Sequence, residues 1–201
     1  MARRGSKVKR SRALGVPLSP KAARVMERRP YRPGQHGRGR ARHSDYKLRL
    51  LEKQRIKAQY GVSEKQLRAV VARVIRRPEP PGDALLVNLE TRLDALVLRA
   101  GFAVTIWQAR QVVRHGHIRV DGAKVDIPSY RVRPGQRLEV AEGSRAMPAF
   151  VAAAAGEYAQ SAPPYLEVDW ADLRARLVRL PRRSEIPVVG DGTRVIEFYA
   201  R

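Results

Sequence analysis

Residues 92–140, RLDALVLRAGFAVTIWQARQVVRHGHIRVDGAKVDIPSYRVRPGQRLEV, decide the fold of this chain. Apolar residues recur at helical spacing in the first part, as far as Gly101. Thr105 and Gln108 then give the capping-box pattern that begins another helix, and Gly116 is placed to end it. The stretch therefore predicts two short helices with basic faces.

After Gly116 the apolar residues alternate with polar ones, as they do in a half-buried strand. The alternating positions are Ile118, Val120, Val125 and Ile127. Asp121-Gly122 lies between the two pairs and predicts a two-residue hairpin turn. Pro134-Gly135 predicts a second turn before Leu138 and Val140, so we expect a small antiparallel sheet of three or more strands. The fold class that follows is α+β.

The chain before this stretch has the pattern of a basic arm followed by helices. Residues 1–18 hold few apolar side chains, so we expect them to order only on a partner. Ser19-Pro20 predicts a short helix over 21–27. The prolines and glycines of 28–46 exclude a regular element there.

Three longer helices are expected between Ser44 and Gly101. Ser44 is an N-cap for the first, which ends at Tyr60, and Ser63 with Gln66 forms a capping box for the second. The third follows the break at 77–82. The apolar faces are Leu67, Val70, Val71, Val74 and Ile75 in the second helix and Leu85, Leu86, Leu89, Leu93, Leu96 and Val97 in the third. Beyond Phe150 we expect a helix at 152–155 and a strand at 165–168, while 170–180 fits either.

The formal net charge of +22 favours a polyanionic partner and disfavours most small-molecule enzymes. The charge is uneven: +13 in residues 1–44, +9 in 45–140 and zero in 141–201. The polyanion should therefore meet the N-terminal two-thirds. With no cysteine, no secretory signal and no apolar run of about 20 residues, we expect a cytosolic protein without disulfides or thiolate metal sites.

The turn at Gly116 brings several donors close together. A backbone that turns at glycine lets phosphate oxygens approach while flanking side chains converge on them. Arg110, Arg114, His115 and His117 flank this turn. The alternative is that the two histidines simply end a helix with favourable dipole contacts. No third ligand makes them a zinc site.

The arginine-rich segment 28–46 also suits RNA, because Tyr31, His36 and Tyr46 are interleaved with its guanidiniums. A merely solubilising tail is the alternative. The helix that follows carries basic residues that fit either a solvated face or a contact surface: Lys47, Arg49, Lys53, Arg55 and Lys57. The charge gradient favours a contact surface.

Catalysis finds little support in the sequence. No G-x-S-x-G, P-loop, H-E-x-x-H or dinucleotide fingerprint occurs, and four histidines without a cysteine are a thin inventory for acid–base or nucleophilic chemistry. Asp94 and Asp126 are acids for which the sequence suggests no partner. Alternatives to a structural RNA-binding protein are an RNA chaperone or RNA-modifying enzyme with the same module, and a nonspecific DNA-compacting protein.

The chain resembles bacterial small-subunit ribosomal protein four (the S-four family) along nearly its whole length. The matching segments are RPYRPGQHGRGR at 29–40, SDYKLRLLEKQR at 44–55, LETRLDALVLRAGFA at 89–103, ARQVVRHGHIRVDG at 109–122, IPSYRV at 127–132 and EFYAR at 197–201. The resemblance implies an extended basic arm at 1–44, a helical domain at 45–90 completed by about 180–201, and an inserted RNA-binding module at 91–179 with its core at 92–140.

The resemblance also implies a function and its residues. It implies a non-enzymatic protein that binds small-subunit rRNA early, nucleates assembly and lies beside ribosomal protein five near the mRNA entry channel, with no membrane or small-molecule substrate. RNA contacts are implied in the module at Arg92, Thr105, Gln108, Arg110, Arg114, His115, His117, Lys124 and Ser129. Contacts before the module are implied at Arg32, His36, Arg38, Arg40, Ser44, Tyr46, Lys47 and Arg55.

Two departures from the family pattern matter. Many relatives carry zinc-binding cysteines near the N-terminus, and this chain has none, so we expect no zinc, no other metal and no cofactor. Where the family usually has Asn-Gly at the hairpin turn, this chain has Asp121-Gly122. That pair keeps the turn geometry but adds a negative charge beside the RNA.

Overall fold

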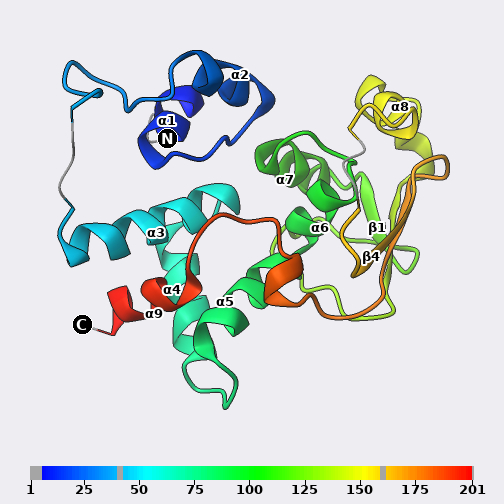
Figure 1. Ribbon diagram of the computed structural model, residues 1–201. Coiled ribbons are helices and arrows are strands. Elements are labelled where there is room, and N and C mark those ends of the chain that lie inside the picture. The colour runs from blue at the N-terminus through cyan, green and yellow to red at the C-terminus, as the bar shows by residue number, and fades with distance from the viewer. Residues whose placement is uncertain (1–5, 40–42, 159–161, 201) are drawn as a thin grey trace. The chain divides into compact units, whose positions relative to one another are not determined.

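The computed structural model describes residues 6–39, 43–158 and 162–200, and the chain divides into two compact units (Figure 1). The first unit comprises Met1–Asp83 and Val188–Arg201, and the second comprises Ala84–Pro187. Helices α3, α4 and α7 begin at the caps that the sequence predicts. Helices together with one antiparallel sheet confirm the α+β class.

The first unit is helical. Its elements are α1 (Lys7–Leu14), α2 (Pro20–Arg28), α3 (Asp45–Gln59), α4 (Glu64–Val74), the first residues of α5 (Pro81–Glu90) and α9 (Gly192–Tyr199). The predicted caps are present: the Ser44 hydroxyl accepts from the amide of Lys47 at 3.3 Å, and Ser63 and Gln66 form the reciprocal capping box. The described part of 28–46 between α2 and α3 contains no helix or strand, as expected.

The N-terminal segment corrects one expectation. Residues 7–14 form α1, which packs against α2 and α3, although the sequence suggested no element before Pro20. The reason is that Leu14, Val16 and Leu18, sparse as they are, are all buried. Gly15, in the left-handed region at φ +68°, ends the helix and turns the chain inward.

The C-terminal segment completes the helical unit. Figure 1 shows α9, in red, beside α3 and α4. The side-chain amide of Gln59 donates to the carbonyl of Val189 at 2.6 Å and accepts from its N–H at 3.0 Å, so the end of α3 is bonded to the backbone just before α9. Of the predicted apolar face of α4, Leu67, Val71 and Val74 are buried, but Ile75 is half-exposed, so its placement in the core was wrong.

The second unit packs helices against one face of a five-stranded antiparallel sheet with the strand order β2-β1-β3-β5-β4. Its remaining elements are α6 (Leu93–Arg99), α7 (Ile106–Arg114), β1 (Ile118–Val120), β2 (Ala123–Lys124), β3 (Arg137–Val140), a 3₁₀ turn at Glu142–Ser144, α8 (Pro148–Ala154), β4 (Leu166–Asp169), β5 (Arg174–Leu177) and a 3₁₀ turn at Arg183–Glu185. Alternation places one side of β1, β3, β4 and β5 in the core, where Val120 lies opposite Leu138 and Leu138 opposite Ala175, while both residues of β2 are exposed. The segment 170–180, which the sequence left open, contains β5.

The helix expected over residues 85–101 is two helices, not one. All six predicted apolar residues are buried, but the backbone of Arg92 is extended and α5 ends before it. The break follows from a strand-like bridge between Arg92 and Arg131, supported by the N–H of Val132 donating to the carbonyl of Thr91 at 2.9 Å. This tertiary pairing outweighs the helical propensity of the sequence.

Candidate nucleic-acid interface

The turn at Gly116 has the predicted form. His115 is the C-cap of α7, Gly116 adopts φ +76°, and the N–H of His117 returns to the carbonyl of Val112 at 3.0 Å. The side chain of Lys124, on β2, lies directly over the Cα of Gly116, where a Cβ would collide with it. Glycine is therefore needed here both for its positive φ and for the space that it leaves to a lysine.

Two exposed cations lie at this turn. Arg114 and Lys124 are exposed, and neither forms an ion pair within the described parts of the chain. His115 is exposed beside them, with its ring centroid 5.9 Å from that of His117. These side chains are available to an anion from solvent.

His117 faces partly inward. Its Nδ1 lies 2.9 Å from the hydroxyl of Ser144, which is buried, and its ring meets Phe150 edge-on at 6.1 Å. The sequence allowed both an RNA contact and a helix-end role for the two histidines. The structure gives His115 the exposed position and gives His117 a packing role.

Asp94 is not a lone acid, which corrects the sequence interpretation. Arg92 binds it in a fork, Nε to Oδ1 at 2.9 Å and Nη2 to Oδ2 at 2.7 Å, and Nε of Arg110 lies 3.4 Å from Oδ2. The Asp94 side chain is wholly buried, and those of Arg92 and Arg110 are 6% and 22% exposed. Burial raises the pKa of the Asp94 carboxyl, against the hydrogen bonds and charge of Arg92 and the charge of Arg110.

The loop carrying Ser129 docks at the same place. The N–H groups of Leu93 and Asp94, at the start of α6, donate to the carbonyls of Tyr130 and Pro128 at 2.9 and 3.2 Å. Ser129, between the two carbonyls, is exposed. Three of the implied RNA contacts, Arg92, Arg110 and Ser129, are therefore brought together around Asp94.

Thr105 and Gln108 are engaged with the start of α7. The Thr105 hydroxyl accepts from the N–H of Gln108 at 3.3 Å, and the Gln108 carbonyl oxygen accepts from the N–H of Val104 at 2.9 Å. Both side chains are partly exposed. Their role in RNA contact stays a prediction, while their role in beginning the helix is visible.

The hairpin turn uses its acid internally. Asp121 at φ +50° and Gly122 at φ +80° make the turn, and the Asp121 carboxylate accepts from the N–H of Arg137 and the side-chain amide of Gln136, both at 2.8 Å. The Arg137 hydrogen bond lowers the pKa of this carboxyl, with help from Gln136. The extra carboxylate at this turn is thus hydrogen-bonded to residues at the start of β3.

The arm contains a small cationic cluster around Tyr31. The guanidiniums of Arg12 and Arg38 lie 5.0 and 4.7 Å from the centre of its ring, and Arg12 also donates to the carbonyls of Tyr31 and Arg32, at 3.1 and 3.4 Å. A hydrogen bond from Arg38 lowers the pKa of Tyr31, against the opposing effect of burial and with help from the charges of Arg38, Arg29 and Arg12. Arg32 is partly exposed and His36 and Arg38 are exposed, while Arg40 lies outside the described residues.

The implied contacts on α3 divide into exposed and engaged residues. Lys47 and Tyr46 are exposed, and the Tyr46 ring lies 5.7 Å from that of Phe198. Arg55 instead donates to Glu52 at 2.7 Å and to the carbonyl of Leu14 at 2.8 Å. The other ambiguous cations of this helix also form ion pairs: Arg49 with Glu197, and Lys53 and Lys57 with Glu64. Most of the charge on α3 is therefore used within the unit.

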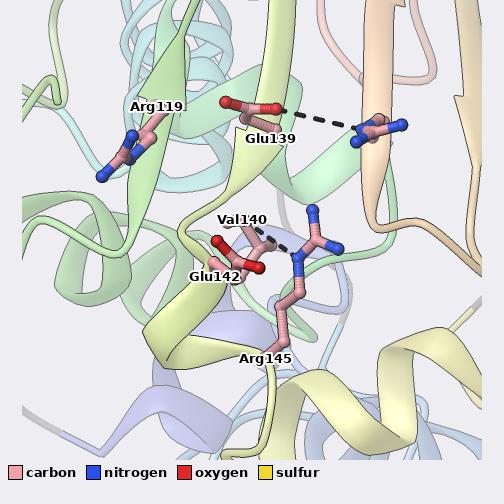
Figure 2. Close-up of a pocket in the computed structure, with 6 residues that line it drawn as sticks. Arg119, Glu139, Val140, Glu142 and Arg145 are labelled. Carbon is pink, nitrogen blue, oxygen red and sulfur yellow. Dashed lines mark hydrogen bonds and ion pairs between the residues drawn. The ribbon is translucent and has the colours of Figure 1, made fainter. Parts of the chain in front are cut away.

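An open pocket in the second unit contains charged residues that the sequence interpretation missed. It is lined by Arg119, Glu139, Val140, Glu142, Arg145 and Arg174. Figure 2 shows Arg145 pointing towards the backbone of Val140, whose carbonyl accepts from its Nε at 3.4 Å. Nε of Arg174 lies 3.9 Å from Oε2 of Glu139. The alternating pattern of β1 puts Arg119 on the outward face, so the sequence could have predicted that this side chain is exposed. It could not have predicted that β1, β3 and β5 bring their charged residues together.

Within residues 6–39, 43–158 and 162–200, no three His, Cys, Asp or Glu side chains gather as a metal site would require. In the same residues, no helix combines the length and the apolar character of a membrane span.

Comparisons with known proteins agree with this arrangement. The model of the S4 domain matches residues 91–138, and the model of the ribosomal protein S4/S9 N-terminal domain matches residues 2–90. Small ribosomal subunit protein uS4 of Streptomyces avermitilis is 55% identical over 197 residues, 97% of each chain. The chain belongs to the uS4 family. The uS4 protein of Bifidobacterium adolescentis is also 55% identical, over 96% of this chain and 95% of its own.

Membership of the uS4 family confirms the resemblance drawn from the sequence motifs. The relatives are ribosomal proteins, which confirms the interpretation that the chain is not an enzyme. The S4 domain match covers α6, α7, the Gly116 turn and the hairpin of β1 and β2. The individual contact residues stay predictions.

Proposed function

We propose that this chain is a structural protein of the small ribosomal subunit that binds small-subunit rRNA. The observation that carries the proposal is the Gly116 turn inside a matched S4 domain, where Arg114 and Lys124 are exposed and form no ion pair with any acid that the structure describes. Lys and Arg contacts to phosphate supply affinity, and the shape of folded RNA supplies specificity.

The N-terminal arm is proposed as a second contact region. Of the net charge of +22, residues 1–44 contribute +13, and the part of them that the structure describes places Arg38 on the ring of Tyr31. Guanidinium and aromatic groups side by side suit irregular RNA, where phosphates and unstacked bases are both exposed. The proposed contacts here are Arg32, His36, Arg38, Arg40, Ser44, Tyr46, Lys47 and Arg55.

Further parts of the proposal rest on the family resemblance. We propose that the protein binds rRNA early and nucleates small-subunit assembly, and that it lies beside ribosomal protein five near the mRNA entry channel. A cytoplasmic ribosome is the proposed location. The charge-neutral residues 141–201 are suited to a protein neighbour, because they add no net repulsion for another basic ribosomal protein.

The proposal is tested by competition binding. The full chain is bound to full-length small-subunit rRNA transcribed in vitro, with duplex DNA and an unrelated RNA of equal length as competitors, from 50 to 200 mM salt. If six to ten phosphates are neutralised, affinity falls roughly 10³- to 10⁵-fold over this range. Equal affinity for rRNA and duplex DNA at physiological salt would refute specific rRNA binding and favour nonspecific compaction.

A further inference from the structure

We propose that Asp94 is a positioning residue for RNA binding: its buried carboxylate fixes the guanidinium of Arg110 for contact with a phosphodiester, and Arg92 secures that carboxylate from the interior. The inference rests on the proposed rRNA binding and assigns a role to an acid within a cationic surface. It also separates Arg92 from the residues that would touch RNA.

The three side chains form a path from the core to the surface. Arg92, at 6% exposure, binds both oxygens of Asp94 from the inner side, at 2.9 and 2.7 Å. Asp94 is wholly buried, and Arg110, at 22% exposure, approaches Oδ2 at 3.4 Å from α7. Of the two arginines, Arg110 is therefore the one with the larger surface open to a ligand.

The backbone of Asp94 is also hydrogen-bonded. Its N–H donates to the carbonyl of Pro128, and that of Leu93 donates to the carbonyl of Tyr130. The carboxylate thus sits where the start of α6, the middle of α7 and the 128–130 loop meet. A carboxylate fixed by Arg92, on a backbone fixed to the 128–130 loop, restrains Arg110 before RNA arrives.

This restraint matters because arginine is long and flexible. A guanidinium recognises a phosphate through a planar fork of donors, and holding that plane in advance reduces the entropy lost on binding. One carboxylate between two guanidiniums leaves one net positive charge at the site. The carboxylate weakens the electrostatic attraction for RNA, but it fixes the direction in which the Arg110 guanidinium can contact a phosphate.

The second unit contains a matched acid that lacks this connection. Glu90 is wholly buried and binds Arg99 in the same forked manner, at 2.5 and 3.3 Å, while the Tyr165 hydroxyl donates to it at 2.8 Å. None of these three residues is among the implied RNA contacts. Glu90→Gln therefore makes the same change of charge at a buried arginine fork whose arginine is not an implied RNA contact.

The experiment measures binding of the full chain to full-length small-subunit rRNA and to an unrelated RNA of equal length. Asp94→Asn and Glu90→Gln each add one positive charge, so bulk electrostatics predicts equal or tighter binding of both. The positioning role predicts that Asp94→Asn weakens rRNA binding by about tenfold or more and reduces selectivity for rRNA. Glu90→Gln should retain the selectivity of the wild type.

Arg110→Lys tests the same point while leaving Asp94 and its fork with Arg92 in place. It keeps the charge but removes the planar fork, so it should lose selectivity as Asp94→Asn does. Wild-type selectivity in Arg110→Lys overturns the proposal. Unchanged or tighter rRNA binding by Asp94→Asn overturns it too, as does a loss of rRNA binding in Glu90→Gln equal to that in Asp94→Asn. Should Asp94→Asn fail to fold, Arg110→Lys decides. A wild-type chain that does not prefer rRNA refutes the proposed function instead.

Discussion

Replacing Glu64 by Gln should loosen the C-terminal helix from the helical unit. Glu64 accepts from Lys57 at 2.7 Å, from Lys53 at 2.9 Å and from the hydroxyl of Tyr199, on α9, at 2.6 Å. Lys53 is only 7% exposed, and its ammonium lies 4.0 Å from the centre of the Phe198 ring. Removing the carboxylate leaves this nearly buried ammonium without its anion.

The magnitude follows from the titration of Glu64. Burial opposes its ionisation, but hydrogen bonds from Lys57, Tyr199 and Lys53 prevail and lower its pKa from 4.5 to about 2. In a fully shielded site this difference would correspond to roughly 3 kcal/mol. The side chain is 45% exposed, so solvent screening reduces the expected loss to about 1–2 kcal/mol.

The sign of the pH dependence is fixed by the lowered pKa. The stabilisation is complete above the unfolded value of 4.5 and is lost as the pH falls towards about 2, because the folded state then binds the proton less readily than the unfolded state. The wild type should therefore lose stability relative to Glu64→Gln between pH 4.5 and 2. The two proteins should converge at the acid end of this range.

The assay combines urea denaturation, followed by far-UV circular dichroism, with amide hydrogen exchange of α9 as a local measure of docking. Glu197→Gln is the matched control, because it removes the ion pair between Arg49 on α3 and Glu197 on α9. The Glu197 side chain is 47% exposed, so the loss of unfolding free energy should be at most about 0.5 kcal/mol. The reasoning is refuted if Glu64→Gln costs no more than the control, or if its difference from the wild type is the same at pH 7 and pH 2.

Replacing Arg110 and Arg114 together with Ala should weaken rRNA binding and make its salt dependence less steep by about 2 in a filter-binding series; an unchanged slope would show that neither side chain meets phosphate. Replacing Gly192 with Ala should cost about 1–3 kcal/mol, because the added Cβ would collide with the carbonyl of Gly82, and should lower the melting temperature by roughly 2–4 °C per kcal/mol. Gly143→Ala, where a Cβ meets nothing within 4 Å, is its control, and an equal melting temperature in both variants would contradict the packing argument.

The features that the sequence predicted well are those specified over three or four residues. Ser44, Ser63 and Thr105 each accept the amide hydrogen bond that their capping patterns require, and Gly116 ends α7 with a positive φ. The same holds for the Asp121-Gly122 turn. In each case the backbone geometry is set by neighbours in the chain, so pattern alone suffices.

The features that it missed depend on partners far along the chain. The helix break at Arg92 is caused by a bridge to Arg131, and α1 exists because three scattered apolar residues pack against α2 and α3. Spacing within either segment carries no sign of these contacts. Burial of sparse apolar residues by another element is a property of the folded chain.

The acids of the second unit show why charge counting alone misjudges an RNA-binding surface. Counted by sequence, Asp94 and Asp121 only subtract from the attraction for phosphate. In the structure, Asp94 anchors Arg92 and Arg110, and Asp121 holds the N–H of Arg137 and the amide of Gln136. Each acid cancels one positive charge of the surface. In exchange it holds hydrogen-bond donors in a fixed direction. Net charge sets how strongly a surface attracts any polyanion, and the fixed direction of its donors sets which polyanion fits. Acids that are hydrogen-bonded among the cations are therefore expected to contribute to specificity.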